Sequence, residues 1–382
     1  GFTAAADPVV RSGPSGMFYY SGIAFNRTKI PGWVNGSVFI SRFIDKNNAE
    51  AGDAIQYLDT QIIADDLKLA ALFVDKPWIA VDAPLPGASM ITISGQQIPR
   101  HNVYIAYSVF VEAAGTQTSS IIFRRSPDCG KTWGIPYILS LGSYLNQGAT
   151  IAIDPRDSGN VYVAWRRFDA KKQTSAIMVA RSRLKGIIFE SARVVATFPS
   201  AQGPFDQPST TATEFPPGTS FRTNSYPTMA VDDKGIVYLA WAQRGYGPTR
   251  ESRIVLVTSR DGLNWSPRAP VDSQLSIQGH QFMPSLAFAA GKLTMAWYDQ
   301  RDDYCGLNLG FDDWISDGLP FRHTIDVRAA QADTAAFPNL AWKTTQISRY
   351  NFTLEEDPDN RGAYKAFQSQ WNPPNYPLFT SG

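Results

Sequence analysis

The sequence predicts an all-β protein, and three observations support this fold class. The first is composition: Asp outnumbers Glu 27 to 7, while Gly (29), Pro (26) and Tyr (16) are plentiful. Such a composition disfavours long exposed helices and favours short strands joined by turns. The second is a two-strand phrase that recurs along the chain, and the third is a turn motif that follows it in phase. Recurrence of this kind is typical of a β-propeller.

Each phrase has a short apolar run, an Asp/Gly turn and a second apolar run that ends in an aromatic residue. Its clearest copy is Ser225–Asp232 followed by Val237–Trp241. Continuous apolar runs split by a turn predict two buried strands paired as a hairpin. The other copies start at Asp7, Asp75, Ala149 and Met283, and their second runs include Val103–Tyr107, Val161–Trp165 and Leu293–Trp297.

The spacing of the phrases predicts the size of the repeat. The final aromatics Tyr107, Trp165, Trp241 and Trp297 are 58, 76 and 56 residues apart, which is room for four short strands and their loops. We therefore expect a propeller of four-stranded antiparallel blades, most simply six-bladed, with an irregular or incomplete last blade. One domain is expected over residues 1–382, with clear repeats over 7–321 and an irregular closing region over 322–382.

Three further segments complete this layout. Ser182–Gly203 is predicted to form a third and fourth strand, with Ile187–Phe189 as its apolar run. Gln202–Asn224 is rich in Pro, Gly and Thr and is expected to be a long loop. Thr345–Tyr350 is expected to be an outer strand.

A turn motif follows the phrase in two blades. Ser126–Trp133 and the one-residue-shorter Ser259–Trp265 resemble the Asp box, Ser-x-Asp-x-Gly-x-Thr-Trp, of the sialidase superfamily, and Ser316–Phe321 is a worn version. The resemblance covers roughly Asp7 to Phe321. It implies turns that stabilise a hairpin. In such a turn Asp accepts hydrogen bonds from backbone N–H groups, Gly takes a positive φ and the aromatic residue packs between blades. The expected structural residues are Ser126, Asp128, Gly130, Trp133, Ser259, Asp261, Gly262 and Trp265.

The same resemblance implies a site on the opposite face from these turns, where second strands end and first strands begin. Arginine suits bidentate capture of a carboxylate or sulfate. In that reading Asp75 is the candidate acid, Glu214 an activator and Tyr304 a nucleophile. The alternative is that arginines ending a strand pair with nearby Asp. The candidate substrate-binding residues are Arg27, Arg166, Arg222, Arg244, Arg301 and His280, with Arg222, Arg244 and Arg301 as a carboxylate-binding triad.

Two functions remain open at this point. The first is a binding or structural propeller with glycan recognition, whose partner is a glycan, a surface polymer or a protein. The second is an exo-glycosidase of sialidase type that acts on an acidic sugar. The absence of the Arg-Ile-Pro phrase that sialidases carry before their first Asp box favours binding, and the arginine- and tyrosine-rich rim favours the enzyme. Fold alone does not choose between them.

Charge and hydropathy exclude other classes. The net charge of +1 gives no basic field for nucleic acid, and no apolar stretch approaches the roughly 18–20 residues that span a bilayer. The start at Gly1, like that of a trimmed product, and sequons at Asn26, Asn35, Asn264 and Asn351 favour a secreted or cell-surface protein.

No cofactor is expected. His101, His280 and His323 lack metal-ligand spacing. The acids of 299–303 and 312–313 offer oxygen ligands that suit Ca²⁺, but without EF-hand spacing solvated loop acids are the expected reading. Cys129 and Cys305 fall on opposite faces of distant blades, which predicts that they are not bonded to each other.

Overall fold

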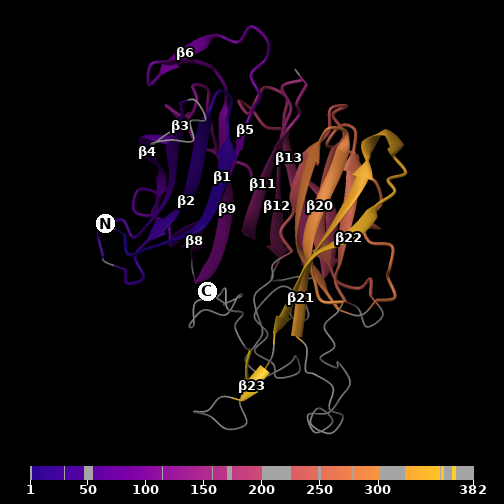
Figure 1. Cartoon of the computed structure of the whole chain (residues 1–382). Helices are drawn as coiled ribbons and strands as arrows, with labels where there is room; N and C mark the ends of the chain where they lie inside the picture. The colour runs from indigo at the N-terminus through magenta and orange to yellow at the C-terminus, as the bar shows by residue number, and fades with distance from the viewer. Residues whose placement is uncertain are drawn as a thin grey trace. The chain divides into compact units, whose positions relative to one another are not determined.

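A computed structural model provides the structure of the protein (Figure 1). It describes residues 2–29, 31–46, 55–113, 115–156, 158–169, 174–199, 225–247, 251–277, 279–301, 323–352, 354–356 and 364–366. In these ranges the chain forms strands and one short 3₁₀ helix, η1 (Thr334–Ala336). None of the helical structure there is long and apolar enough to cross a membrane.

Five four-stranded sheets account for most of the strands, and each is antiparallel, as the sequence predicts. The first contains β1 (Ala4–Ser12), β2 (Met17–Phe25), β3 (Gly36–Asp45) and β4 (Ile55–Asp65). The second contains β5 (Phe73–Val81), β8 (Val103–Ala113), β9 (Thr116–Ser126) and β10 (Tyr137–Ile138). The third contains β11 (Leu145–Ile153), β12 (Val161–Asp169), β13 (Thr174–Ser182) and β14 (Arg193–Pro199). The fourth contains β15 (Thr228–Val231), β16 (Val237–Gln243), β17 (Arg253–Ser259) and β18 (Ala269–Pro270). The fifth contains β19 (Gln281–Ala289), β20 (Lys292–Asp299), β21 (His323–Asp333) and β22 (Lys343–Phe352).

Two small hairpins stand outside this repeat. β6 (Met90–Ile93) pairs with β7 (Gln96–Pro99) between the first and second strands of the second sheet. β23 (Leu354–Glu356) pairs with β24 (Tyr364–Ala366) after the fifth sheet. The all-β propeller class with four-stranded antiparallel blades is thereby confirmed.

The prediction of six blades is corrected to five for the described part of the chain. The worn turn motif Ser316–Phe321 lies outside the described residues, and the third strand of the fifth sheet is β21, which begins at His323. The closing region over 322–382 therefore supplies two regular strands to the fifth sheet. Thr345–Tyr350 is an outer strand as predicted, because it lies within β22.

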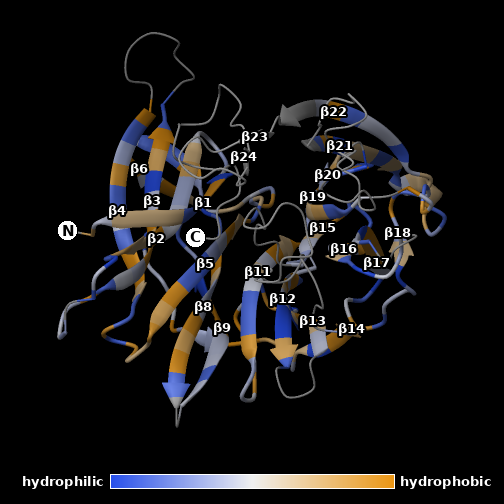
Figure 2. Cartoon of the chain, turned by 90° about the horizontal axis from the view of Figure 1, so that it is seen from below, coloured by the Kyte–Doolittle hydropathy of each residue, from blue (hydrophilic) through white to orange (hydrophobic). Residues whose placement is uncertain are grey.

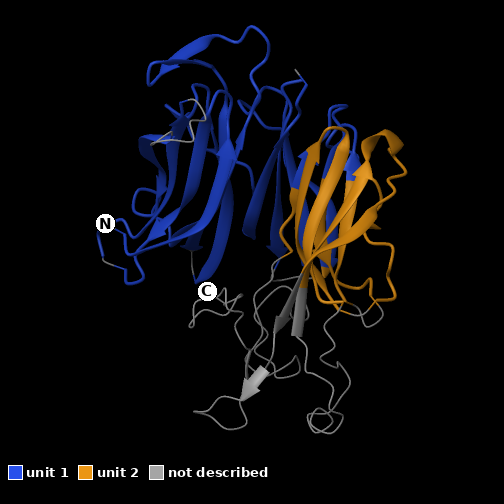
Figure 3. Cartoon of the chain, viewed as in Figure 1, with its two compact units in different colours: residues 1–198, 229–238, 258–265 blue, residues 199–228, 239–257, 266–382 orange. Residues whose placement is uncertain are grey.

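The chain divides into two compact units (Figure 3). Unit 1 comprises 1–198, 229–238 and 258–265, and unit 2 comprises 199–228, 239–257 and 266–382. Unit 1 holds the first three sheets, and unit 2 holds the fifth. The expectation of a single domain over the whole chain stays a prediction.

The cores of the sheets follow from the apolar phrases. In unit 1, hydrophobic segments coincide with strands such as β5 and β8 (Figure 2). Val103, Ile105 and Tyr107 of β8 are almost fully buried, as are Val161, Val163 and Trp165 of β12. Both faces of these strands are buried, which explains why their apolar runs are continuous rather than alternating.

First strands share a bulge. The register shifts at one place in β1, β5, β11 and β19. The residues there with positive φ are Asp7 (53°), Lys76 (46°), Gly148 (70°) and Met283 (50°). A bulge re-aims the neighbouring side chains and often stands beside a functional site. In unit 1 the bulges lie beside charged residues on two neighbouring first strands, β1 and β5, and beside the amide of Gln147 on a third, β11.

The Ser126 and Ser259 turns have the geometry that the motif predicts. Ser126 Oγ accepts from the Gly130 N–H at 2.9 Å, and Asp128 Oδ1 accepts from the Thr132 N–H at 2.8 Å. In the second turn Ser259 Oγ accepts from the Gly262 N–H, and Asp261 Oδ1 accepts from the Asn264 N–H, both at 2.8 Å. These bonds hold the pKa of Asp128 and of Asp261 below the ordinary value, although burial opposes them.

The third sheet contains an equivalent turn that sequence reasoning missed. Ser182 Oγ accepts from the Gly186 N–H at 3.0 Å, and Phe189 is buried where the motif places Trp. Leu184 occupies the position at which the motif has Asp, so the sequence does not reveal this copy of the turn. Consequently Ile187–Phe189 lies in the turn rather than in a strand, which corrects the prediction. Of the strand pair predicted within Ser182–Gly203, only the fourth strand, β14, falls in that range, because the third strand, β13, ends at Ser182.

Candidate functional site

Two carboxylates from neighbouring strands meet in unit 1. Asp75 is on β5, Asp7 is on β1, and β5 lies between β1 and β11 (Figure 2). Gln147 Nε2 of β11 donates to Asp75 Oδ2, and Lys76 Nζ is 3.4 Å from Asp7 Oδ1. We name Asp7, Asp75, Lys76 and Gln147 the carboxyl cluster. It combines two carboxylates, an ammonium and an amide from three strands.

The carboxyl cluster favours a proton on Asp75. This residue is only 9% exposed, and burial together with the charge of Asp7 raises its pKa to about 6. Lys76 and Gln147 oppose the shift by stabilising the charged form. Near neutral pH the cluster therefore holds a carboxyl group that readily gains or loses a proton.

An exposed loop lies at the same end of unit 1. It joins β2 to β3, and the backbone N–H of Asn26 donates to the Asn35 carbonyl at 2.8 Å. Lys29 Nζ donates to the carbonyl of Leu72, directly before β5, at 2.6 Å. The loop carries Trp33, which is 69% exposed, and the predicted site residue Arg27, which is also exposed. The β2–β3 loop thus supplies an open aromatic surface beside the strand that carries Asp75.

Arg166 has a different environment from the predicted open rim. The side chain is fully buried in β12, where Nη2 donates to Ser175 Oγ at 2.8 Å. Its guanidinium lies over the rings of Phe168 at 4.3 Å and Phe198 at 5.2 Å. These contacts make Arg166 part of the packing of the third sheet.

Arg301 is held by acidic partners in unit 2. Nη2 pairs with Asp299 Oδ2 at 2.6 Å and with Asp272 Oδ2, and Nε donates to Asp299 Oδ1 at 2.8 Å. Nη1 donates to Gln274 Oε1 at 3.2 Å. To bind a ligand carboxylate, this guanidinium would have to give up one of these bonds. The arrangement matches the alternative in which arginine pairs with nearby Asp.

The structure brings His280 and Arg244 together in unit 2. His280 Nδ1 accepts from the Ser252 N–H at 3.0 Å, so the proton of the neutral ring is on Nε2. Burial holds the pKa of His280 well below its ordinary value, and the positive charges of Arg244 and Arg253 lower it further. His280 is therefore a neutral ring with a fixed tautomer.

The remaining predicted residues lie outside the described ranges. They are Glu214, Arg222, Tyr304 and Cys305, and the loop 202–224 has only its flanks described. Cys129 is a buried free thiol. In the part of the chain that is described, no group of three or more His, Cys, Asp or Glu side chains is arranged to hold a metal ion. Asp299, one of the acids considered for Ca²⁺, instead binds Arg301 and accepts from Trp297 Nε1 at 2.8 Å.

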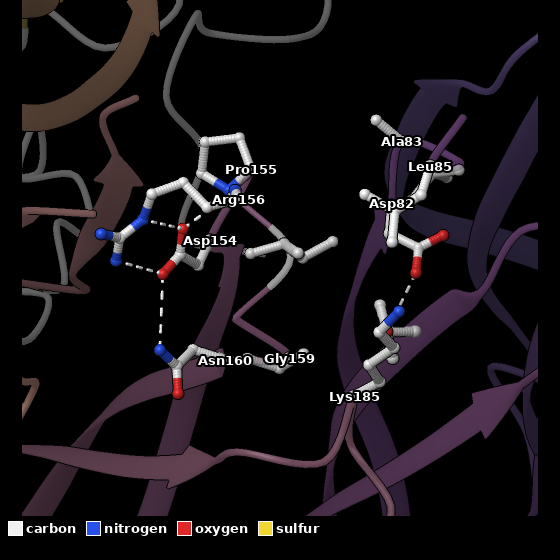
Figure 4. Close-up of a pocket in the computed structure, with 13 residues that line it drawn as sticks. Asp82, Ala83, Leu85, Asp154, Pro155, Arg156, Gly159, Asn160 and Lys185 are labelled. Atoms are coloured by element: carbon white, nitrogen blue, oxygen red, sulfur yellow. Dashed lines mark hydrogen bonds and ion pairs between the residues drawn. The ribbon is translucent and has the colours of Figure 1, made fainter. Parts of the chain in front are cut away.

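A cavity of about 210 Å³ lies at the other end of the second and third sheets (Figure 4). Asp82 and Lys185 line one side of it, and Asp154 and Asn160 the other. Asp154 accepts a hydrogen bond from Arg156 Nη2 at 2.7 Å. The hydrogen bonds that its carboxylate accepts lower the pKa of Asp154 to about 2. Asp82 follows the last residue of β5, whereas Asp75 is near its start, so about 20 Å of strand separates them. The cavity and the carboxyl cluster are therefore separate features.

Comparison with known proteins gives relatives in fold. No family model matches the chain, and no curated protein matches it. Among solved structures, the Hadza microbial sialidase Hz136 is 13% identical with a TM-score of 0.47, and the match covers 92% of this chain and 61% of that one. Trypanosoma rangeli sialidase in complex with sialic acid is 12% identical with a TM-score of 0.46, and the match covers 94% of this chain and 51% of that one.

A third similar structure is a protein of unknown function from Dyadobacter fermentans. It is 12% identical with a TM-score of 0.45, and the match covers 90% of this chain and 95% of that one. Sialidases are thus among the solved structures that this chain resembles, as its motifs predicted. The chain spans about three fifths of the length of the Hadza sialidase and about half of the Trypanosoma enzyme. At these identities the likeness concerns the fold alone.

Proposed function

We propose that this propeller recognises glycans at the end of unit 1 that holds the carboxyl cluster. The observation that carries the proposal is the approach of Asp7 and Asp75 from two first strands. A carboxyl group that is buried beside a second carboxylate, as Asp75 is beside Asp7, reduces stability when it ionises, because burial and the neighbouring charge both raise its pKa. Groups with strongly shifted pKa values in such places are candidates for functional sites.

The chemistry of the cluster suits a polyhydroxylated ligand. A protonated Asp75 donates a hydrogen bond, Asp7 accepts one, and Lys76 and Gln147 add donors. Sugar hydroxyls both donate and accept, so they can satisfy all four groups. Trp33 offers an exposed aromatic face of the kind that packs on the apolar C–H face of a ring. Arg27 adds a cation at the same end, which supports a preference for acidic sugars.

A second candidate function is glycoside hydrolysis, and the pKa of Asp75 is the specific observation that favours it. A general acid works best when its pKa lies near the operating pH, and a carboxyl raised to about 6 meets this condition. In this version Asp75 protonates the leaving-group oxygen, and Glu214 and Tyr304, predicted from the sequence as activator and nucleophile, lie outside the described residues. We also propose that the protein is secreted or lies at the cell surface, where it would meet glycans. In the same proposal the Ser126 and Ser259 turns are Asp boxes.

A glycan panel with a matched pair of variants tests the proposal. Binding of acidic and neutral oligosaccharides is measured by calorimetry, and release of a fluorogenic aglycone is measured in parallel. Asp75→Asn removes the carboxyl of the cluster while it keeps the shape. Asp233→Asn makes the same chemical change at an exposed position of unit 1, in the turn between β15 and β16 and away from the carboxyl cluster.

Binding that is lost in Asp75→Asn and kept in Asp233→Asn is the expected result. Release of the aglycone that is lost in Asp75→Asn and kept in the control variant would show that the protein is a glycoside hydrolase. If no glycan on the panel binds, or if Asp75→Asn binds as the wild type does, the proposed site is wrong.

A further inference from the structure

An exposed aliphatic surface lies at the opposite end of unit 1 from the carboxyl cluster. Its most exposed member, Ile135, is 89% exposed and follows the Ser126 turn. Ile187 and Ile188 are each 58% exposed and belong to the Ser182 turn of the next sheet. We call this set the aliphatic turn surface, and it consists of Ile135, Ile138, Leu184, Ile187 and Ile188.

The two turns adjoin each other. Tyr137 Oη donates to the Phe189 carbonyl at 3.2 Å, and the two rings are 5.6 Å apart. Phe189 in turn packs on Phe123 at 4.7 Å. The inward aromatic residues therefore stabilise the join, while the neighbouring isoleucines point outward and add nothing to this core.

Such a surface is costly unless something covers it. Isolated exposed apolar residues are ordinary, but contiguous patches on soluble proteins mark interaction sites. An Ile-Ile pair at a turn has no role in forming the turn, because Ser182 and Gly186 make its hydrogen bonds. The patch is consequently explained better by a partner than by the fold.

The charges around the patch favour an anionic partner. Lys131 and Arg193 are exposed beside the two turns. Two carboxylates lie nearby and are outnumbered by cations: Glu190 pairs with Arg181 at 2.7 Å and with Arg183 at 3.1 Å, while Asp128 accepts from Thr132 and keeps its negative charge. The surface is thus aliphatic at its centre and basic at its edge.

From this combination we infer that the aliphatic turn surface binds an anionic lipid bilayer. Aliphatic side chains at turns can enter the boundary between headgroups and acyl chains, and Lys and Arg near the surface are attracted by acidic headgroups. A protein interface would instead be expected to be rich in Tyr, Trp, Phe and Met. The carboxyl cluster, at the other end of unit 1, would then face away from the lipid.

Vesicle sedimentation tests this inference with the full chain. The probes are phosphatidylcholine vesicles with and without phosphatidylserine. The test variant is the double substitution Ile187→Ser with Ile188→Ser. Ile62→Ser is the matched control, because Ile62 is 52% exposed on β4 and lies outside the patch. Thermal unfolding of each variant confirms that the fold is kept.

The wild type is expected to sediment with phosphatidylserine vesicles and to be released by salt. The double variant should bind roughly tenfold more weakly or worse, because two of the five aliphatic side chains that would enter the bilayer are replaced by polar ones. Ile62→Ser should bind as the wild type does. No sedimentation of the wild type, or equal sedimentation of the double variant, would overturn the inference. So would a wild-type dimer without lipid that the double variant converts to a monomer, since the patch would then bind a second copy.

Discussion

Asp75 and Asp154 are two buried carboxyl groups whose surroundings act in opposite directions. Asp75 faces Asp7 and gains few bonds to its charged form, so its pKa rises to about 6. Asp154 accepts from Arg156, Ser158 and Asn160, so its pKa falls to about 2. The first arrangement suits chemistry with a ligand, and the second stabilises a turn.

Asp75→Asn is expected to change how stability depends on pH. Because the folded-state pKa of Asp75 exceeds the unfolded value, its contribution to the free energy of unfolding falls as pH rises from about 4 to about 6. The fall is on the order of 2–3 kcal/mol, since one pKa unit corresponds to about 1.4 kcal/mol. Urea unfolding at pH 4, 5, 6 and 7 measures it. The variant should lack this component, and an identical pH profile for both proteins would contradict the shift.

Asp154→Asn is expected to give the opposite sign. The lowered pKa of Asp154 contributes stability above pH 4, and this contribution is lost as pH falls towards 2. At pH 7 the variant should be less stable by about 2 kcal/mol, and the difference should narrow in acid. The same urea series checks it, and a gap that stays constant down to pH 2 would count against the assignment.

At the scale of the element, the turn between the third and fourth strands is the unit that sequence reasoning recognised best. Ser126–Trp133 and Ser259–Trp265 could be predicted because their Ser, Asp and Gly make local bonds that any such turn requires. The Ser182 turn could not, because Leu184 replaces the Asp and only the Ser and Gly bonds remain. Local chemistry predicts an element only while its residue signals are intact.

Bulges in the first strands show the same limit. A proline follows the positive-φ residue in three of the four bulges, after Asp7, Lys76 and Met283, but not after Gly148. The sequence therefore contains a signal for three of these bulges. Asp75 was proposed from its place before the first strand of its phrase. The partners Lys76 and Gln147 were not found, because which side chains a bulge brings together depends on the pairing of distant strands.

Gly262→Ala is expected to destabilise the protein more than Gly115→Ala. Both glycines have φ near 70°, so the two alanines carry similar backbone strain. A Cβ at Gly262 would lie 2.3 Å from Tyr162 Cε1, whereas nothing is within 4 Å at Gly115. We expect roughly 1–3 kcal/mol of additional loss at Gly262 from this overpacking. Chemical denaturation measures the difference, and equal losses would show that the turn is not packed on Tyr162.

At the scale of the whole molecule, unit 1 has a different chemistry at each end of its strands. One end holds the carboxyl cluster and Trp33, and the other holds the cavity and the aliphatic turn surface. The class of fold was predictable, because a repeated phrase survives many substitutions. The number of blades was not, because the closing region lacks the phrase and β21 and β22 carry no turn motif between them. The predicted arginine rim separates into the buried Arg166, the acid-paired Arg301 and the exposed Arg27, since sequence position does not reveal the direction of a side chain.

Trp33→Ala is expected to weaken glycan binding roughly tenfold without loss of stability, because the ring contacts ligand rather than core. Trp33→Phe should keep part of the affinity. Tyr57→Ala, at a 55% exposed aromatic on β4, is the control and should bind as the wild type does. Equal affinity of Trp33→Ala and the wild type in calorimetry would exclude this ring from the site.

Carboxyl-carbon NMR can decide whether Asp75, held beside Asp7, has a raised pKa and contacts the ligand. The side-chain carboxyl signals are followed from pH 3 to pH 8, and Asp75→Asn assigns the signal of Asp75. We expect a titration near pH 6 in the free protein and a displaced midpoint when a saturating glycan is present. A midpoint near the ordinary value of about 4 that no glycan moves would contradict it.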